Sequence, residues 1–484
     1  MYCQVAYLRG CLPGRIRHAL AELPETLDET YERTLRRIHK GNWEFAHRLF
    51  QCVAVAPRPL SVKELAEFLA FDFEIGPIPQ FHEGWRLEDP VAAVLSTCST
   101  LLAVVNVKGS KVIQFSHFSV KEYLTSTRLT EKCDPISSPG RFHVSVAAAH
   151  TLVAQACLGL LLHFGDDITA GSLQTFPLAE YAARHWVGHG QCADALSNLR
   201  DGIKLLFDPS RPHLAVWVWI YDLEGSWSQT WWVEKPPRLR ETPLHYAALY
   251  CSDTTLRFLV TEYPEDVNAR SQDDNSTPLH RASGNGRAEV VRILLEHGAD
   301  PIAQSKRGWA PLHRASDRGH VEVVRLLIGF GAGASARDDQ GWTPLHWASD
   351  RGHADVACVL LEYGADATAR DEQGWTPLHR ASDQGHAELA RVLLERGGAE
   401  VTARDKYGWT PLRHATEKGR LDVVRVLLAH GAGATTSFTR ASGSPSQAGL
   451  ASVCPIPPFW VWHSSARELH DSMTIPRSIS WWNS

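Results

Sequence analysis

The sequence predicts a mainly α-helical protein, in which a winged-helix and helical region is followed by a solenoid of stacked helix pairs. Three observations predict this fold class. A phrase close to Thr-Pro-Leu-His recurs in the second half, apolar residues of the first half recur at helical spacing, and a short β-hairpin interrupts those helices. The phrase begins at Thr242, Thr277, Ala310, Thr343, Thr376 and Thr410. Its steps of 35, 33, 33, 33 and 34 residues indicate a repeat architecture.

Composition limits the functional classes. The chain has 484 residues, which is enough for about two to four domains. Its net charge of −5 argues against a nucleic-acid-binding protein. Its ten cysteines form no Cys-x-x-Cys pair, which suits reduced thiols in an intracellular protein. The first residues lack the pattern of a signal peptide, so we expect a cytoplasmic protein.

The first half begins with helices and then changes period. Residues 1–40 are predicted to be helical, with an apolar stripe through Leu27, Tyr31 and Leu35. Residues 61–64, Ser-Val-Lys-Glu, form a capping box that begins a further helix. Residues 102–107 and 112–115 read as two strands, and Ser119 is expected to begin the helix after them. Helices followed by a hairpin predict a winged-helix domain over residues 41–130.

Residues 131–210 are predicted to be a helical spacer. Residues 144–165 carry no formal charge and are about as long as a membrane span, but polar side chains interrupt them. A buried helix is therefore the expected structure. Residues 211–239 are rich in tryptophan, and the alternation in residues 216–219, Val-Trp-Val-Trp, favours a strand. We interpret this junction as a hydrophobic contact for the first repeat; an aromatic platform for a carbohydrate is the alternative.

The repeat beginning at Thr343 shows how each unit is built. Thr343 is a suitable helix N-cap, and Pro344 fits the first helical position. Gly352 separates two helices, and Gly364 is suited to end the second in the left-handed conformation. Such a helix pair can bury its apolar face only against its neighbours. These units closely resemble the ankyrin repeat, six of them over residues 240–435, and the Ser-, Gly- and Pro-rich residues 436–484 are expected to be disordered.

The ankyrin resemblance implies a protein partner that contacts the hairpin tips and the concave face of the first helices. The candidate contact residues are Trp309, Trp342, Trp375 and Trp409 before each Thr-Pro, Arg314, Trp347 and Arg380 after the histidine, and Arg318 and Arg351 one turn later. Tryptophan beside arginine is typical of binding hot spots. The alternative is that the tryptophans stack between adjacent repeats. The repeat histidines are too far apart to share a zinc ion, so we expect no metal and no cofactor.

Residues 23–31, 58–60 and 115–124 resemble fungal NACHT proteins, which are relatives of NOD-like receptors. The matching region of that family lies just after its nucleotide-binding module, so residues 1–20 would be the tail of that module. A NACHT module needs a P-loop, and no Gly-x-x-x-x-Gly-Lys-Ser/Thr occurs in this sequence. The resemblance makes His117 a candidate contact for the phosphate of ADP. The alternative is a packed structural histidine.

The sequence thus predicts a non-enzymatic interaction protein, the ankyrin sensor part of a NACHT-type signalling protein. One alternative is a fragment of an ATP-switch STAND NTPase whose P-loop domain is missing or on another chain, so that nucleotide binds only if that domain is supplied in trans. Another is a plain ankyrin scaffold. Because residues 63–68 are mixed in charge, we expect no nucleic-acid partner, and we expect no membrane partner.

Overall fold

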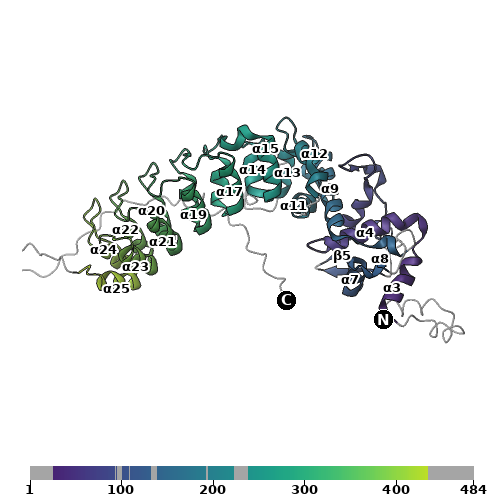
Figure 1. Ribbon diagram of the computed structural model, residues 1–484, viewed down its shortest axis with the longest axis horizontal. Helices are drawn as coiled ribbons and strands as arrows, with labels where there is room; N and C mark the ends of the chain where they lie inside the picture. The colour runs from purple at the N-terminus through teal and green to yellow at the C-terminus, as the bar shows by residue number, and fades with distance from the viewer. Residues whose placement is uncertain are drawn as a thin grey trace, which may run out of the picture. The chain divides into compact units, whose positions relative to one another are not determined.

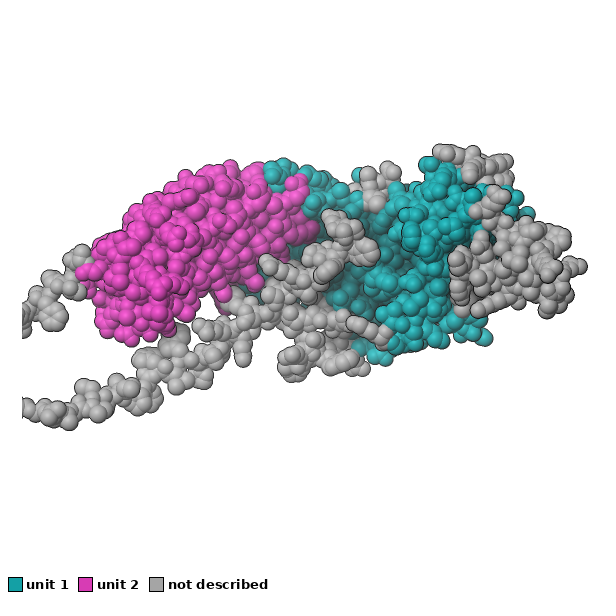
Figure 2. Space-filling view, turned by 90° about the horizontal axis from the view of Figure 1, so that it is seen from below, with its two compact units in different colours: residues 1–221, 233–281, 292–299 teal, residues 222–232, 282–291, 300–484 magenta. Residues whose placement is uncertain are grey.

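The computed structural model describes residues 26–92, 94, 101–107, 109–131, 139–191, 195–222 and 238–433. The described chain is mainly helical and begins with a small helix-and-sheet region that is followed by helix pairs (Figure 1). It divides into two compact units, residues 1–221, 233–281 and 292–299 in one and the remaining residues in the other (Figure 2). The predicted C-terminal tail, the first 25 residues and Trp227, Trp231 and Trp232 lie outside the described residues.

The N-terminal region contains helices and a β-hairpin that the sequence predicts, together with three short strands that it does not predict. They are α3 Leu27–Arg36, α4 Trp43–Val55, β1 Leu60–Ser61, α5 Val62–Glu67, β2 Phe71–Asp72, β3 Gln80–Phe81, β4 Leu102–Val107, β5 Ser110–Phe115, α7 Phe118–Thr125 and α8 Arg128–Glu131. The larger sheet has the antiparallel order β1-β5-β4, in which Ile113 lies opposite both Leu60 and Val104. The capping box of α5 is confirmed, since the Ser61 amide donates to Glu64 at 2.6 Å and the Glu64 amide donates to Ser61 Oγ at 3.2 Å.

The predicted start of α7 is wrong. Its N-cap is His117, whose Nδ1 accepts a hydrogen bond from the Ser119 amide at 3.3 Å. The Ser119 hydroxyl instead lies 2.6 Å from His117 Nδ1 and 2.7 Å from the Tyr31 hydroxyl. An imidazole nitrogen can accept the amide as a serine oxygen does, so the cap lies two residues earlier than the Ser-x-x-Glu pattern indicates.

Four described α-helices lie within the predicted spacer: α9 Val146–His163, α10 Ala170–Leu173, α11 Ala179–His189 and α12 Ala195–Phe207; α13 His213–Asp222 follows them in the predicted tryptophan-rich junction. Helix α9 packs against α4, α11 and α12 as a core helix of its unit. Gly159 allows a close approach, because a Cβ atom there would lie 2.3 Å from the Pro79 carbonyl oxygen. Among the described helices, α9 alone has the length and apolar composition of a membrane span.

The strand predicted at residues 216–219 is wrong, because this stretch lies within α13. Trp217 is buried and donates from Nε1 to the Ala183 carbonyl at 2.9 Å. Its ring contacts Trp186, with centroids 5.5 Å apart, and Tyr250, with centroids 6.1 Å apart. Val216 is buried together with Trp217 and Trp219, so the alternation of valine and tryptophan does not separate an inner from an outer face. Burial of Trp217 and Trp219 also removes these two rings from any exposed carbohydrate platform.

Six consecutive helix pairs follow. Their bounds are α14 Pro243–Tyr250 and α15 Asp253–Glu262, α16 Pro278–Gly284 and α17 Ala288–Glu296, α18 Pro311–Arg318 and α19 Val321–Gly329, α20 Pro344–Arg351 and α21 Ala354–Glu362, α22 Pro377–Gln384 and α23 Ala387–Glu395, α24 Pro411–Glu417 and α25 Leu421–Ala429. The predicted left-handed conformation of Gly364 is confirmed, with φ of 80°, and Gly352, which separates the two helices as predicted, is left-handed too, with φ of 79°.

The histidine of the recurring phrase bonds to the helix cap of its own repeat and to a backbone carbonyl of the next repeat. His346 Nδ1 accepts from the Thr343 amide at 3.1 Å, while Nε2 donates to the Trp375 carbonyl at 3.0 Å. His379 bonds the Trp409 carbonyl in the same way at 3.2 Å. The imidazole must stay neutral to accept at Nδ1. Burial favours that form and lowers the pKa of His346 and of His379 to about 4.

We expect the ankyrin array to lose stability as the pH falls from about 6.5 towards 4. An unfolded histidine has a pKa of about 6.5, whereas His346 and His379 titrate near 4 in the folded chain. Above this window both states are neutral at these residues; within it the unfolded state binds more protons, so acidification favours unfolding. Urea unfolding followed by tryptophan fluorescence at a series of pH values measures the effect.

The variants His346→Gln and His379→Gln should each flatten this pH dependence, because the titrating group is gone. His430→Gln is the matched control, since His430 is exposed on the last helix pair. An unchanged slope in the His346→Gln variant contradicts the assignment.

Candidate protein-binding surface

The tryptophans before each Thr-Pro lie in one continuous column in the C-terminal unit. Trp347 lies between Trp309 and Trp342, with ring centroids 4.3 and 4.4 Å away. The Arg380 guanidinium lies between Trp342 and Trp375, at 3.8 and 4.4 Å from the ring centroids. In the last repeat, a third planar group continues the same alternation. The repeats are thus interleaved by side chains as well as by packed helices.

His414 is that third group. Its ring lies 4.4 Å from Trp375 and 5.1 Å from Trp409. It occupies the position that Trp347 and Arg380 occupy in their repeats, one residue after the histidine of the recurring phrase. We call this position the slot. Tryptophan, arginine and histidine differ in charge, but each has a flat face and an N–H donor.

In Trp347, Arg380 and His414, the N–H donor of the slot residue meets a buried carboxylate of its own repeat. Trp347 Nε1 donates to Asp338 at 3.1 Å. Arg380 donates to Asp371 at 2.7 Å, and His414 Nε2 lies 3.0 Å from Asp405. Because each aspartate lies four residues before the column tryptophan, the Asp-x-x-Gly-Trp spacing was the available sequence signal. Our sequence analysis missed these aspartates.

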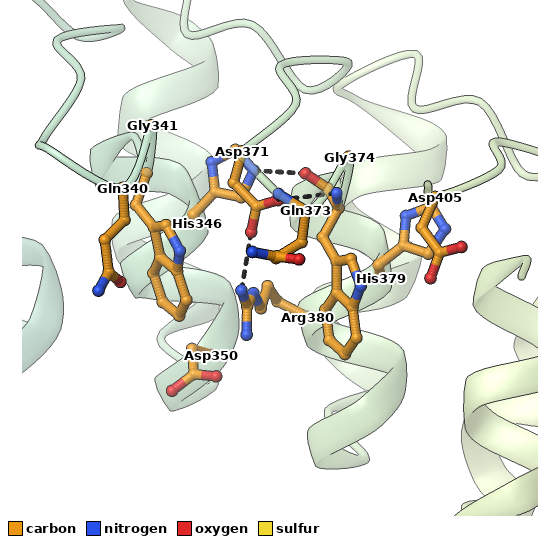
Figure 3. Close-up of polar contacts among 12 residues, drawn as sticks. Gln340, Gly341, His346, Asp350, Asp371, Gln373, Gly374, His379, Arg380 and Asp405 are labelled. Carbon is orange, nitrogen blue, oxygen red and sulfur yellow. Dashed lines mark hydrogen bonds and ion pairs between the residues drawn. The ribbon is translucent and has the colours of Figure 1, made fainter. Parts of the chain in front are cut away.

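The same carboxylates shape the hairpins. Asp371 Oδ1 accepts from the amides of Gln373 and Trp375, both at 2.8 Å, while Oδ2 faces Arg380 (Figure 3). The Asp371 side chain is 0% exposed and that of Arg380 is 17% exposed, so water screens this ion pair weakly. Gly374, with φ of 77°, allows the turn between the two amides.

Asp405 shows the electrostatic balance of this arrangement. Burial acts to raise the pKa of its carboxyl group, but the hydrogen bond with His414 and the bonds from the Trp409 and Tyr407 amides act in the opposite direction. The net effect is a pKa below the usual value. The carboxylate therefore stays ionised where it can hold both the hairpin and the slot residue.

The column ends on an arginine at each side. Arg314 lies over Trp309 at 4.7 Å from the ring centroid. Arg413 replaces the repeat histidine in the last described repeat, and its guanidinium lies 3.9 Å from the Trp409 centroid. In the preceding repeats, the slot residue of the next repeat lies against the tryptophan, as Arg380 does at Trp342 and His414 does at Trp375.

The first helix of each repeat, which we call the inner helix, also bonds to its neighbour: α18 is linked to α20, and α20 to α22. Arg351 Nε donates to Asp317 at 2.8 Å, and Arg318 lies 3.7 Å from the same carboxylate. Gln384 donates to Asp350 at 3.2 Å. Arg351 keeps 43% of its side chain exposed while making its bond, so it can still meet a partner.

The structure thus divides the predicted contact residues into three groups. Trp309 and Trp342 are buried; Trp375, Trp409, Arg314, Trp347, Arg380 and Arg318 are half-buried; Arg351 and His117 are exposed. The stacking of tryptophans between adjacent repeats is present. Their use by a partner stays a prediction. In the parts of the chain that the structure describes, no three His, Cys, Asp or Glu side chains converge as metal ligands.

The hairpin tips are the exposed part of this surface. We define them as residues 306–307, 339–340, 372–373 and 406–407, all of them exposed. Neighbouring tips are joined by backbone hydrogen bonds of 3.1–3.2 Å, from Asp339 to Arg307, from Glu372 to Gln340 and from Lys406 to Gln373. Tyr407 is 75% exposed at the last tip. These bonds hold the exposed tip side chains at fixed spacing.

Comparisons with known proteins agree with this architecture. The ankyrin-repeats profile matches three times, over residues 229–305, 300–371 and 367–437. A profile described as the winged helix domain of GPI inositol-deacylase matches residues 32–133. The chain therefore has a winged-helix domain at its N-terminal side and ankyrin repeats, which point to a protein-interaction module, at its C-terminal side.

Among curated proteins, the chain is 30% identical over 300 residues to azaphilone pigments biosynthesis cluster protein L from Monascus ruber, covering 58% of this chain and 61% of that protein. It is 38% identical over 76 residues to ankyrin repeat domain-containing protein 49 from Bos taurus, covering 15% of this chain and 32% of that protein. The potassium channel AKT1 from Oryza sativa subsp. indica is 45% identical over 58 residues, which are 12% of this chain and 6% of the channel. The chain thus spans about three fifths of the first relative's length and smaller parts of the others.

We expect Arg380→Lys to lower the free energy of unfolding by about 1–3 kcal/mol, because an ammonium group cannot stack on two indoles and face Asp371 as a planar guanidinium does. Trp375→Ala should also lower the free energy of unfolding, by less than the about 3–5 kcal/mol that removal of a fully buried aromatic costs, because Trp375 is half-buried. Chemical denaturation of the full chain measures both. Arg391→Lys, on the exposed face of α23, is the control and should change little. Equal stability of Arg380→Lys and Arg391→Lys would show that the column does not stabilise the array.

Proposed function

We propose that this chain is the ankyrin sensor part of a NACHT or NOD-like-receptor-type signalling protein, and that it acts by binding a protein partner. The match to a winged-helix domain ahead of an ankyrin array supports this reading, since that order is the one expected after a nucleotide-binding module. We propose no catalytic role, no nucleic-acid or membrane partner, and a cytoplasmic location. The matching profile takes its name from a deacylase, and our proposal assigns no deacylase activity to this chain.

We propose the following domain boundaries for this reading. They are residues 1–40 for the tail of a NACHT-type region, 41–130 for the winged helix, 131–210 for the helical spacer, 211–239 for the tryptophan-rich junction, 240–435 for the ankyrin repeats and 436–484 for a tail. The profile matches over residues 32–133 and 229–437 support the second and fifth of these.

The fixed row of hairpin tips carries the proposal. In the column and on the inner helices, polar groups are largely used for contacts between repeats. The tips have their backbone bonded and their side chains exposed, so binding requires little further ordering of the backbone. Gln340, Gln373 and Tyr407 present amide and aromatic groups along this row, and Arg351 adds a guanidinium on the inner helix. Such a row fits an extended protein surface better than a small molecule.

The exposure of His117 favours a second candidate function, the nucleotide switch. Since its Nδ1 accepts the Ser119 amide, a neutral imidazole carries its proton on Nε2. The side chain is exposed at the start of α7, where an N–H donor and the amide end of a helix both favour an anion. This candidate requires a phosphate-binding module from another chain or from a longer form of this one.

We expect the full chain, used as bait, to retain a partner whose affinity falls at least tenfold in the triple variant Gln340→Ala/Gln373→Ala/Tyr407→Ala. These side chains are exposed, so the melting temperature should stay within about 2 °C. The double variant Arg325→Ala/Arg391→Ala is the control and should bind normally. These residues lie on α19 and α23, the second or outer helices of their repeats. Loss of binding in the control alone would assign the interface to the outer helices.

For the second candidate, we expect no binding of labelled ADP or ATP to the purified chain, with or without Mg²⁺, because no P-loop is present. Equilibrium dialysis measures this. Binding that disappears in His117→Ala but persists in His39→Ala would contradict the sensor-only function and support a switch.

A further inference from the structure

The hairpin tips carry charges in an ordered row. The first position of successive tips holds Lys306, Asp339, Glu372 and Lys406, so the charge runs positive, negative, negative and positive. All four residues are exposed. They belong to the same compact unit of the chain, so the row is part of one array.

The charges of this row are not used within the array. In the part of the chain that the structure describes, Asp339, Glu372 and Lys406 make no side-chain ion pair. Charges on the inner helices, by contrast, pair between repeats: Arg351 lies 2.8 Å from Asp317, for example. The tip carboxylates therefore remain available for the charge of a partner.

The second position of the tips adds groups that can bond a peptide backbone. It holds Arg307, Gln340, Gln373 and Tyr407. Gln340 and Gln373 lie at equivalent positions of two successive hairpins (Figure 3). Each side-chain amide can donate and accept hydrogen bonds, so it can pair with the N–H and C=O groups of an extended ligand.

The spacing of the tips selects the conformation of the ligand. The inner helices pack in succession, α18 on α20, α20 on α22 and α22 on α24, and packed helix axes lie about 8–10 Å apart. A polyproline II segment has three residues per turn and rises 3.1 Å per residue, so every third side chain returns to the same face after about 9 Å. This step matches one repeat.

Two other conformations fit the row less well. In a β-strand, residues three apart point to opposite faces, so only one of them would meet a tip. In an α-helix, the backbone groups bond one another and leave nothing for Gln340 and Gln373. Polyproline II has no internal hydrogen bonds, so its backbone groups are free to bond these amides.

We propose that the hairpin tips bind a polyproline II segment of the partner protein in which two basic side chains lie three residues apart, with an acidic side chain three residues beyond each. The basic side chains face Asp339 and Glu372, and the acidic side chains face Lys306 and Lys406. Tyr407 packs against one end of the segment, as aromatic side chains do in other sites for such ligands. The inference rests on the proposed function, because it names the partner's chemistry at the same surface.

Two peptides of identical composition test the charge pattern. The matched probe is labelled Glu-Pro-Pro-Arg-Pro-Pro-Arg-Pro-Pro-Glu, and the reversed probe is Arg-Pro-Pro-Glu-Pro-Pro-Glu-Pro-Pro-Arg; proline favours the required conformation in both. We expect the full chain to bind the matched probe at least tenfold more tightly in fluorescence anisotropy at low salt. The ratio should fall as salt is added, because exposed charges are screened.

The spacing has its own control. In Glu-Pro-Arg-Pro-Arg-Pro-Glu, the charges keep their order but lie two residues apart, which no longer matches one repeat. This probe should bind at least fivefold more weakly than the matched one. Equal binding of the two spacings, equal binding of the matched and reversed probes, or no measurable binding of the matched probe overturns the proposal.

A charge-reversed variant of the full chain locates the contact. It should prefer the reversed probe and keep the melting temperature of the unaltered chain within about 2 °C, because all its substitutions are at exposed positions. The variant is Lys306→Glu/Asp339→Lys/Glu372→Lys/Lys406→Glu. If it folds poorly, Asp339→Asn/Glu372→Gln should remove most of the preference without reversing it.

The matched control reverses a charge pair elsewhere in the same unit. Glu388 and Arg391 lie 3.1 Å apart on α23, and Glu388→Lys/Arg391→Glu should keep the preference for the matched probe. An unchanged preference in the charge-reversed variant overturns the proposal. A partner that is lost in Gln340→Ala/Gln373→Ala/Tyr407→Ala but retained by the charge-reversed variant overturns the charge pattern alone and leaves the tips as the binding surface.

Discussion

A buried carboxylate near the base of each hairpin connects local structure to the packing of neighbouring repeats. In Asp371, one oxygen accepts two backbone amides and so fixes the turn, while the other holds Arg380 between two tryptophans. Asp338 and Asp405 do the same with Trp347 and His414. Removing one partner from such a pair leaves a charge buried without compensation, which is strongly destabilising. The hairpin tips keep their positions because this carboxylate is satisfied.

The slot residues explain why variation within the repeats does not by itself identify a binding surface. Trp347, Arg380 and His414 look unrelated in sequence, yet each fills the same space and donates to the same carboxylate position. In these three repeats the slot holds a planar N–H donor, whether or not that group is charged. An arginine here gains from the indole faces and from the carboxylate at once, which makes it part of the scaffold. The exposed side chains of the hairpin tips fill no such position between repeats, so the residue types at the tips can change to suit a partner.

The sequence predicted the elements whose determinants are local. The six Thr-Pro phrases, the Ser61 capping box and the β4–β5 hairpin depend on residues within a few positions of one another, and all appear in the fold. Stacking of the tryptophans between repeats was one of two interpretations of the sequence, but the residues that lie between them were not predicted, because Trp342 meets Arg380 from 38 positions away and the period does not give side-chain direction. Helix α13 was mistaken for a strand because Val216, Trp217 and Trp219 are all buried, so the alternation of valine and tryptophan does not mark an inner and an outer face. His117 was recognised as a possible ligand contact but not as a helix cap.

The last described repeat keeps a planar group over its column tryptophan with a different residue. In the interior repeats, the histidine donates to a carbonyl of the next repeat, as His379 does to Trp409. In the last described repeat, Arg413 stands at the position of this histidine, and its guanidinium lies 3.9 Å from the Trp409 ring centroid. An arginine can cover an indole face with its planar group while its N–H groups reach water. The departure from the repeat pattern at Arg413 thus preserves a contact of the column, although the residue type has changed.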